Sequence, residues 1–255
     1  MKRFLLLATV LLAACSSTTT SSGSAAPTDL TVFAASSLTA AFNKIGTDFE
    51  AANPGVQVTF NFGSSTDLAT QIGSEGTADV FASASGTAMD TVEKDPGVQD
   101  RQDFATNSLV IITPNDDPGG VSSLQDLAKP GLQLVLAAEG VPVGDYARQM
   151  LDAAGLSKEI LANVVSNEPD DASVVAKVKS GEADAAIVYT SDISSADVRD
   201  VTIPDNQNVV ATYPIAVIVG APAGDLATTF VDDVTGTQGE ATLAQFGFGP
   251  PPSSG

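Results

Sequence analysis

Two pairs of adjacent serines have the residue types and the spacing that could bind an anion. Ser36-Ser37 and Ser64-Ser65 each stand between a strand-like run and a helical run of the chain. Apolar residues alternate before each pair and recur at three- and four-residue steps after it. The first turn of a helix leaves backbone N–H groups without partners and carries partial positive charge. A serine there either caps its own helix or donates to a bound oxyanion, and the repeated arrangement favours the anion.

The chain lacks the residues of several common catalytic and metal sites. It contains no histidine and a single cysteine among 255 residues. Serine and cysteine triads and histidine-ligated metals are therefore excluded, and we expect no coordinated cation and no cofactor. Catalysis by carboxylates alone stays open because 31 acidic residues are available, although their spacing marks no pair. The net charge of −20 argues against nucleic acid as a partner.

The first 28 residues are typical of an export signal followed by a tether. Lys2 and Arg3 precede the apolar run Phe4 to Leu12, and a small-residue cleavage site ends at Cys15. This site is similar to a bacterial lipobox, which predicts a signal peptide over 1–14 and lipid on Cys15. An ordinary secretory signal that contains a cysteine is the alternative. Residues 15–28 are predicted to be a flexible lipidated tether, so we expect an extracytoplasmic protein that is lipid-anchored to the cell membrane.

The rest of the chain alternates strand-like and helical segments, which predicts an α/β protein with helices on both faces of largely parallel sheets. The apolar run 208–220 is interrupted by Pro214, which indicates an edge strand, a bulge or a crossing point. Two amphipathic helices are expected over 225–234 and 238–246. The polar residues 249–255 are expected to form a disordered tail.

Seven motifs, in chain order, resemble the substrate-binding protein of bacterial molybdate ABC transporters. They are FAASSLT (33–39), FGSSTDLATQI (62–72), ADVFASA (78–84), NSLVIITP (107–114), VPVGDYA (141–147), AIVYTSD (186–192) and YPIAV (213–217). The resemblance implies a type II periplasmic-binding-protein fold, with two lobes of mostly parallel sheet flanked by helices and a ligand cleft between them. Lobe I would comprise 29–107 and 214–248, and lobe II 108–213.

The resemblance also implies five contacts to a molybdate or tungstate ion. Ser37, Ser65 and Tyr189 would contribute hydroxyls, and Val143 and Ala172 backbone N–H groups. The match to Ala172 leaves Asp171 or Ser173 open as alternatives. The residues support the same site independently, since the four positions other than Tyr189 lie at predicted helix starts and Tyr189 ends a predicted strand. Ser36 and Ser64, the neighbours of the two serines, are expected to matter less.

The function implied is a monomeric receptor that delivers molybdate, and also tungstate, to an ABC transporter permease. A receptor for sulfate or another tetrahedral oxyanion is the main alternative, followed by a non-binding sensory domain and an exported carboxylate-based enzyme. None of the five expected ligand residues is charged, so a protonated ion such as phosphate would leave its proton unpaired. Asp67 is the one carboxylate expected to change this, if it points into the cleft.

Overall fold

The structure is a computed structural model that describes residues 28–193 and 197–253. The predicted signal peptide, Cys15 and residues 15–27 of the predicted tether lie outside the described residues. The strands are β1 (Thr28–Ala35), β2 (Val56–Gly63), β3 (Val80–Ala82), β4 (Val98–Thr113), β5 (Leu134–Ala137), β6 (Val164–Glu168), β7 (Ala185–Tyr189), β8 (Arg199–Thr202) and β9 (Val210–Ile218). The α-helices are α1 (Thr39–Ala52), α2 (Ser65–Glu75), α3 (Gly86–Lys94), α4 (Pro142–Ala153), α5 (Ser157–Leu161), α6 (Asp171–Lys179), α7 (Gly224–Thr235) and α8 (Thr237–Gln245). Short 3-10 helices lie at Ser36–Leu38, Leu124–Ala128, Thr190–Ile193 and Asp205–Gln207.

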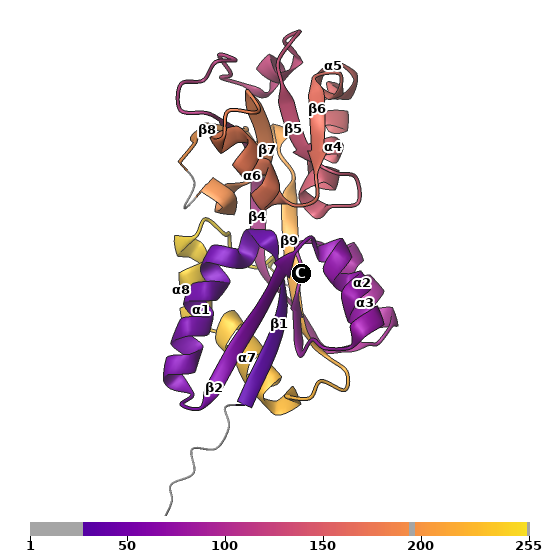
Figure 1. The fold of residues 1–255 in the computed structure, drawn as a ribbon, viewed down its shortest axis with the longest axis vertical. Helices are drawn as coiled ribbons and strands as arrows, with labels where there is room; N and C mark the ends of the chain where they lie inside the picture. The colour runs from indigo at the N-terminus through magenta and orange to yellow at the C-terminus, as the bar shows by residue number, and fades with distance from the viewer. Residues whose placement is uncertain (1–27, 194–196, 254–255) are drawn as a thin grey trace, which may run out of the picture.

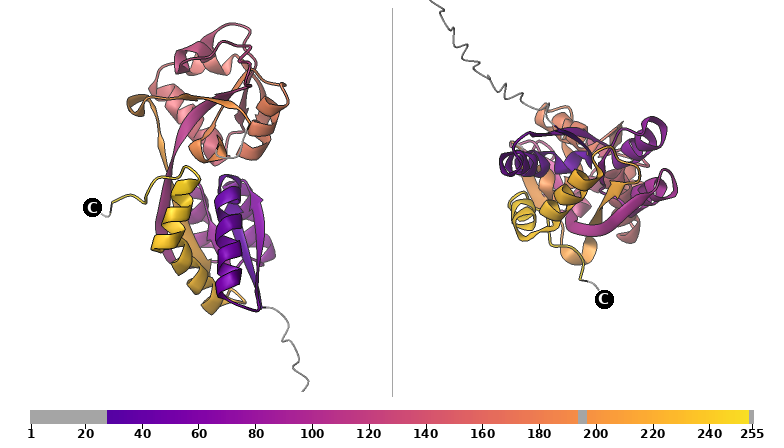
Figure 2. Two further views of the ribbon diagram at one scale, coloured as in Figure 1. Left: turned by 90° about the vertical axis from the view of Figure 1, so that its left-hand side faces the viewer. Right: turned by 90° about the horizontal axis from the view of Figure 1, so that it is seen from below.

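The molecule consists of two bodies joined by long strands (Figures 1 and 2). We call β1–β3 with α1–α3, α7 and α8 lobe I, and β5–β8 with α4–α6 lobe II. The strand order is β2-β1-β3-β9-β4-β7-β5-β6, with β8 paired to β4. In lobe I, β1 pairs in parallel with β2 and β3, and in lobe II, β5 pairs in parallel with β6 and β7. Strand-helix-strand units produce this arrangement. β4 and β9 run antiparallel to their neighbours and pass between the lobes.

The two crossing strands place both lobes on one hydrogen-bonded framework. β4 pairs with β9 up to Ser108 and with β7 from Leu109 onward. The β4–β9 register shifts between Asp103 and Ala105, opposite Pro214 and Tyr213. Of the edge strand, bulge and crossing point that Pro214 left open, the structure shows a bulge in β4 opposite Pro214, in a strand that crosses between the lobes.

The core of lobe I shows why these residues form a layered sheet. Leu30 and Val32 of β1 join the cluster that contains Phe42 of α1 and Phe230 of α7. Phe33 belongs instead to a second cluster with α2 and α3. The alternation along β1 therefore buries both faces of the sheet.

Two parts of the chain differ from the sequence-based expectation. The first half of β4 contains mostly exposed polar and charged residues, so its pattern gave no strand signal. Gly249, which we expected in a disordered tail, pairs with Thr106 of β4, and the Thr106 hydroxyl donates to the Pro250 carbonyl at 2.9 Å. Packing against β4 orders these tail residues.

Candidate functional site

A small cavity lies where the two lobes meet, and four of the five expected ligand residues line it. Its volume is about 10 Å³, which is room for about one water-sized sphere. Pockets for drug-sized ligands are larger, about 300–1,000 Å³. The cavity is therefore too small for a drug-sized organic ligand. The lining residues are Ala35, Ser36, Ser37, Gly63, Ser64, Ser65, Ala84, Val141, Pro142, Val143, Asp171 and Tyr189.

Ser37 reaches the cavity from the turn after β1, but it does not cap α1 as one interpretation of the sequence had it. A 3-10 helix over Ser36–Leu38 separates β1 from α1, and Leu38 occupies the N-cap position without a side-chain bond. The Ser37 hydroxyl instead lies 2.9 Å from the Tyr213 hydroxyl. This contact leaves Ser37 available to the cavity rather than to its own helix.

Ser65 is the first residue of α2 and is almost completely buried. Its Oγ accepts a hydrogen bond from the Ala84 backbone N–H at 2.9 Å, so its own proton is left to donate. Ser64 also lines the cavity, and its buried hydroxyl has no hydrogen-bond partner among the described residues. Ser64, which we expected to matter less, is therefore a further candidate donor that the sequence pattern could not separate from Ser65.

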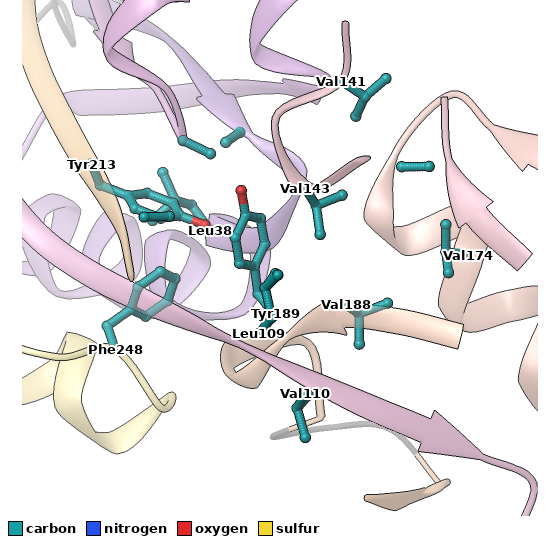
Figure 3. Close-up of a cluster of buried hydrophobic side chains, with 14 of the residues drawn as sticks. Leu38, Leu109, Val110, Val141, Val143, Val174, Val188, Tyr189, Tyr213 and Phe248 are labelled. Atoms are coloured by element: carbon teal, nitrogen blue, oxygen red, sulfur yellow. The ribbon is translucent and has the colours of Figure 1, made fainter. Parts of the chain in front are cut away.

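Lobe II contributes a helix start and a strand end. Val143 is the second residue of α4, where a backbone N–H has no partner within the helix. Tyr189 ends β7 with its side chain 1% exposed, and its hydroxyl has no hydrogen-bond partner in the described chain. In Figure 3 this hydroxyl points away from Leu109, toward the space between Tyr213 and Val143. Burial raises the pKa of Tyr189 well above its usual value, so the group is a neutral donor.

Ala172 does not line the cavity, and Asp171 occupies the place expected for it. The Ala172 N–H donates to Asp171 Oδ1 at 3.0 Å, and Ala172 lines an adjacent groove that also includes Ser36 and Ser37. Asp171 is the first residue of α6, and its side chain lies at the cavity while Asp170 caps the helix through the Ser173 N–H. Of the alternatives that the sequence left open, the structure favours Asp171 over Ala172 and Ser173.

The expectation that no carboxylate reaches the cavity is wrong, although not because of Asp67. Asp67 is exposed and does not line the cavity, whereas Asp171 lines it and is 3% exposed. Burial raises the pKa of Asp171 to about 6, the hydrogen bond from the Ser36 hydroxyl lowers it, and the charge of Asp170 raises it. Burial and the neighbouring Asp171 also raise the pKa of Asp192 well above its usual value.

Two hydrogen bonds join the lobes next to the cavity. The Ser36 hydroxyl of lobe I donates to Asp171 of lobe II, and the Thr66 hydroxyl of α2 donates to the Gly140 carbonyl before α4. Ser36 and Asp171 both line the cavity, and Thr66 and Gly140 line a groove that shares Pro142 with it. They hold the serine-bearing turns of lobe I against the helix starts of lobe II.

The described residues offer no alternative metal or membrane chemistry. Within 28–193 and 197–253, no group of three or more acidic, cysteine or histidine side chains is placed to hold a metal ion. None of the helices described there is long and apolar enough to cross a membrane. The cavity with its hydroxyls and helix starts is therefore the site to compare with known proteins.

Known proteins are similar to this chain both in sequence and in fold. Residues 30–249 match the family described as bacterial extracellular solute-binding protein. The chain is 42% identical over 234 residues to the molybdate-binding protein ModA of Mycobacterium tuberculosis, covering 89% of this chain and 88% of that protein. The Azotobacter vinelandii periplasmic molybdate-binding protein matches with a TM-score of 0.77 at 21% identity, covering 88% of this chain and 100% of that one. The sulfate-binding protein SubI of Mycobacterium tuberculosis matches with a TM-score of 0.75 at 18% identity, covering 88% and 87%. The fold is thus that of type II periplasmic binding proteins, and proteins named for different oxyanions share it.

Proposed function

The chain belongs to the family of bacterial extracellular solute-binding proteins, with molybdate-binding proteins among its relatives, and on this premise we propose that it captures molybdate in the cavity between its lobes. It is a binding protein and not an enzyme. In this proposal Ser37, Ser65 and Tyr189 donate their hydroxyl protons to the oxyanion, and the Val143 N–H donates from the start of α4. Tungstate, with the same charge and shape, would bind in the same way.

One observation carries the proposal: buried hydroxyls converge on a small cavity between the lobes, and two of them lack a hydrogen-bond partner in the described chain. The Tyr189 and Ser64 hydroxyls are buried without a hydrogen-bond partner in the described chain. A buried hydroxyl without a partner costs about 1–3 kcal/mol, so natural proteins rarely retain one without a ligand or water to satisfy it. No lysine or arginine lines the cavity, so neutral dipoles would carry the recognition.

We further propose how the protein is anchored and organised. Residues 29–107 with 214–248 would form one rigid lobe and 108–213 the other, and both would close on the ion. Lipid on Cys15 would hold the monomeric receptor at the cell membrane, where it would deliver the ion to an ABC transporter permease. The relationship to ModA and the lipobox-like sequence support this part of the proposal.

A receptor for sulfate is the second candidate, because sulfate is also a tetrahedral dianion without a proton at neutral pH. The fold likeness to a sulfate-binding protein keeps this alternative open. The 42% identity to a molybdate-binding protein favours molybdate over it. Affinity for each ion separates the two candidates.

The test is calorimetric titration of the purified protein with molybdate, tungstate, sulfate and phosphate. We expect molybdate and tungstate to bind more tightly than sulfate, and phosphate is included because the Asp171 carboxyl group can accept its proton. Removing one charge-assisted hydroxyl donor, in Ser65→Ala or Tyr189→Phe, should weaken molybdate binding about ten- to a hundredfold.

Matched controls test whether these losses belong to the cavity. Ser74→Ala changes an exposed serine of the same helix as Ser65, and Tyr146→Phe changes a half-buried tyrosine outside the cavity. Both should bind like wild type. Sulfate binding tighter than molybdate, or equal losses in the controls, would contradict the proposal.

A further inference from the structure

A series of hydrogen bonds between residues outside the cavity lining leads to Ser37. It begins at Asn107 on β4 and passes through Tyr213 on β9, which are 2% and 0% exposed. Asn107 Nδ2 donates to the Tyr213 hydroxyl oxygen at 3.3 Å, and that hydroxyl lies 2.9 Å from Ser37 Oγ. Neither Asn107 nor Tyr213 lines the cavity.

The orientation of the Asn107 side chain follows from its neighbours. The Ser108 backbone N–H contacts Asn107 Oδ1 at 3.0 Å, and the Thr190 hydroxyl donates to the same oxygen at 2.7 Å. A backbone N–H can only donate, so the atom that it meets must be the oxygen. The amide nitrogen is therefore the atom that faces Tyr213 and Ser191.

The orientation of Asn107 determines which way the Tyr213 and Ser37 hydroxyls donate. Because Asn107 donates to the Tyr213 oxygen, the Tyr213 proton is left to donate to Ser37 Oγ. A serine hydroxyl has one proton and two acceptor positions, so Ser37, once it accepts from Tyr213, is left to donate elsewhere. Ser37 lines the cavity, so this proton can point into it.

We propose that Asn107 and Tyr213 are positioning residues that turn the Ser37 hydroxyl proton toward the bound anion. This inference rests on the proposed function. It extends that function, because a donor with fixed direction favours an oxygen without a proton and disfavours a ligand that presents an O–H at the same place. Linked hydrogen bonds also polarise one another, which strengthens Ser37 as a hydrogen-bond donor.

The Tyr213 ring has a packing role that Phe preserves. It contacts Phe104, Tyr189 and Phe248 in edge-to-face arrangements with centroids 6.3, 5.8 and 5.4 Å away. Figure 3 shows the rings of Tyr189 and Phe248 beside it. Tyr213→Phe keeps these contacts and removes only the hydroxyl. A change in binding by this variant therefore reports the hydrogen-bond chain.

The experiment is a double-mutant cycle of molybdate affinity, measured by calorimetry, with Ser37→Ala as the second substitution. Tyr213→Phe alone should weaken binding about three- to tenfold, the effect of one neutral hydrogen bond. In the Ser37→Ala background the same substitution should have no further effect. Tyr146→Phe is the matched control and should bind like wild type in both backgrounds.

Asn107→Asp provides a second variant, which reverses the direction of the hydrogen bond between residue 107 and Tyr213. Its second carboxylate oxygen would accept from Tyr213, so Tyr213 would no longer donate to Ser37. Binding should weaken, and more so in the presence of Ser37 than in the Ser37→Ala background. A loss that is equal in both backgrounds would reflect the added charge alone and overturn the inference.

The outcomes separate this inference from the proposed function. Normal binding by Tyr213→Phe, together with weak binding by Tyr189→Phe, would overturn the positioning role and leave the site intact. Absence of binding by the wild-type protein to all four oxyanions would overturn both.

Discussion

Raising the pH from 6 to 8 should weaken molybdate binding by up to about fiftyfold, because of the buried carboxyl group of Asp171. Asp171 lines the cavity and has a pKa of about 6. Below pH 6 its carboxyl group is mostly neutral and tolerates a neighbouring dianion. Above pH 6 it becomes a carboxylate that repels the ion, so binding requires the uptake of a proton.

The magnitude follows from the pKa of the free protein. If only the protonated form binds, the apparent Kd is raised about twofold at pH 6 and about a hundredfold at pH 8. The difference corresponds to about 2.3 kcal/mol, since each tenfold change equals about 1.4 kcal/mol. This is the upper limit, because any binding to the carboxylate form reduces the slope.

Other groups near Asp171 do not give the same dependence of molybdate binding on pH. Burial raises the pKa of Tyr189 well above its usual value, so its hydroxyl stays neutral over this range. Burial and the charge of Asp171 raise the pKa of Asp192, but Asp192 lines the adjacent groove and not the cavity. Lys179 lines the same adjacent groove and does not line the cavity. Asp171 is therefore the group whose titration changes the charge at the cavity.

The assay is calorimetry at pH 6, 7 and 8, repeated in two buffers with different ionisation enthalpies to count the protons taken up. Wild type should take up close to one proton per ion at pH 8. Asp171→Asn retains an acceptor for the Ser36 hydroxyl but cannot ionise, so its affinity should be independent of pH and should equal or exceed that of wild type at pH 8. A pH-independent wild type, or the same slope in Asp171→Asn, would refute the reasoning.

Two further predictions concern the helix start in lobe II and the anchor. Gly144 follows Val143, and a Cβ there would lie 2.3 Å from the Ala138 carbonyl oxygen, so Gly144→Ala should lower the free energy of unfolding by about 1–3 kcal/mol and weaken anion binding. Gly224→Ala, at a helix start with open space around it, is the control for urea unfolding and should change little. Cys15→Ser should shift the protein from the detergent phase to the aqueous phase without changing its anion affinity, and a mutant that stays in the detergent phase would rule out the lipid anchor.

The sequence by itself determined the features that depend on neighbours along the chain. The change from a two-residue to a three- or four-residue period located the turns that carry Ser37 and Ser65. Pro142 and Gly144 similarly marked the start of α4. Such signals are visible because a helix start or a strand end is specified within a few residues. The absence of histidine likewise needed no structure.

The tertiary structure decided which of these groups meet and what each does. Ser36 contacts Asp171 across 135 positions, and Ser37 contacts Tyr213 across 176, so no local pattern could show either bond. The same packing replaced Ala172 by Asp171 at the cavity and left the Ser64 hydroxyl without a partner in the described chain. Burial then set the pKa of Asp171, because desolvation depends on everything packed around a carboxyl group and not on its place in the sequence.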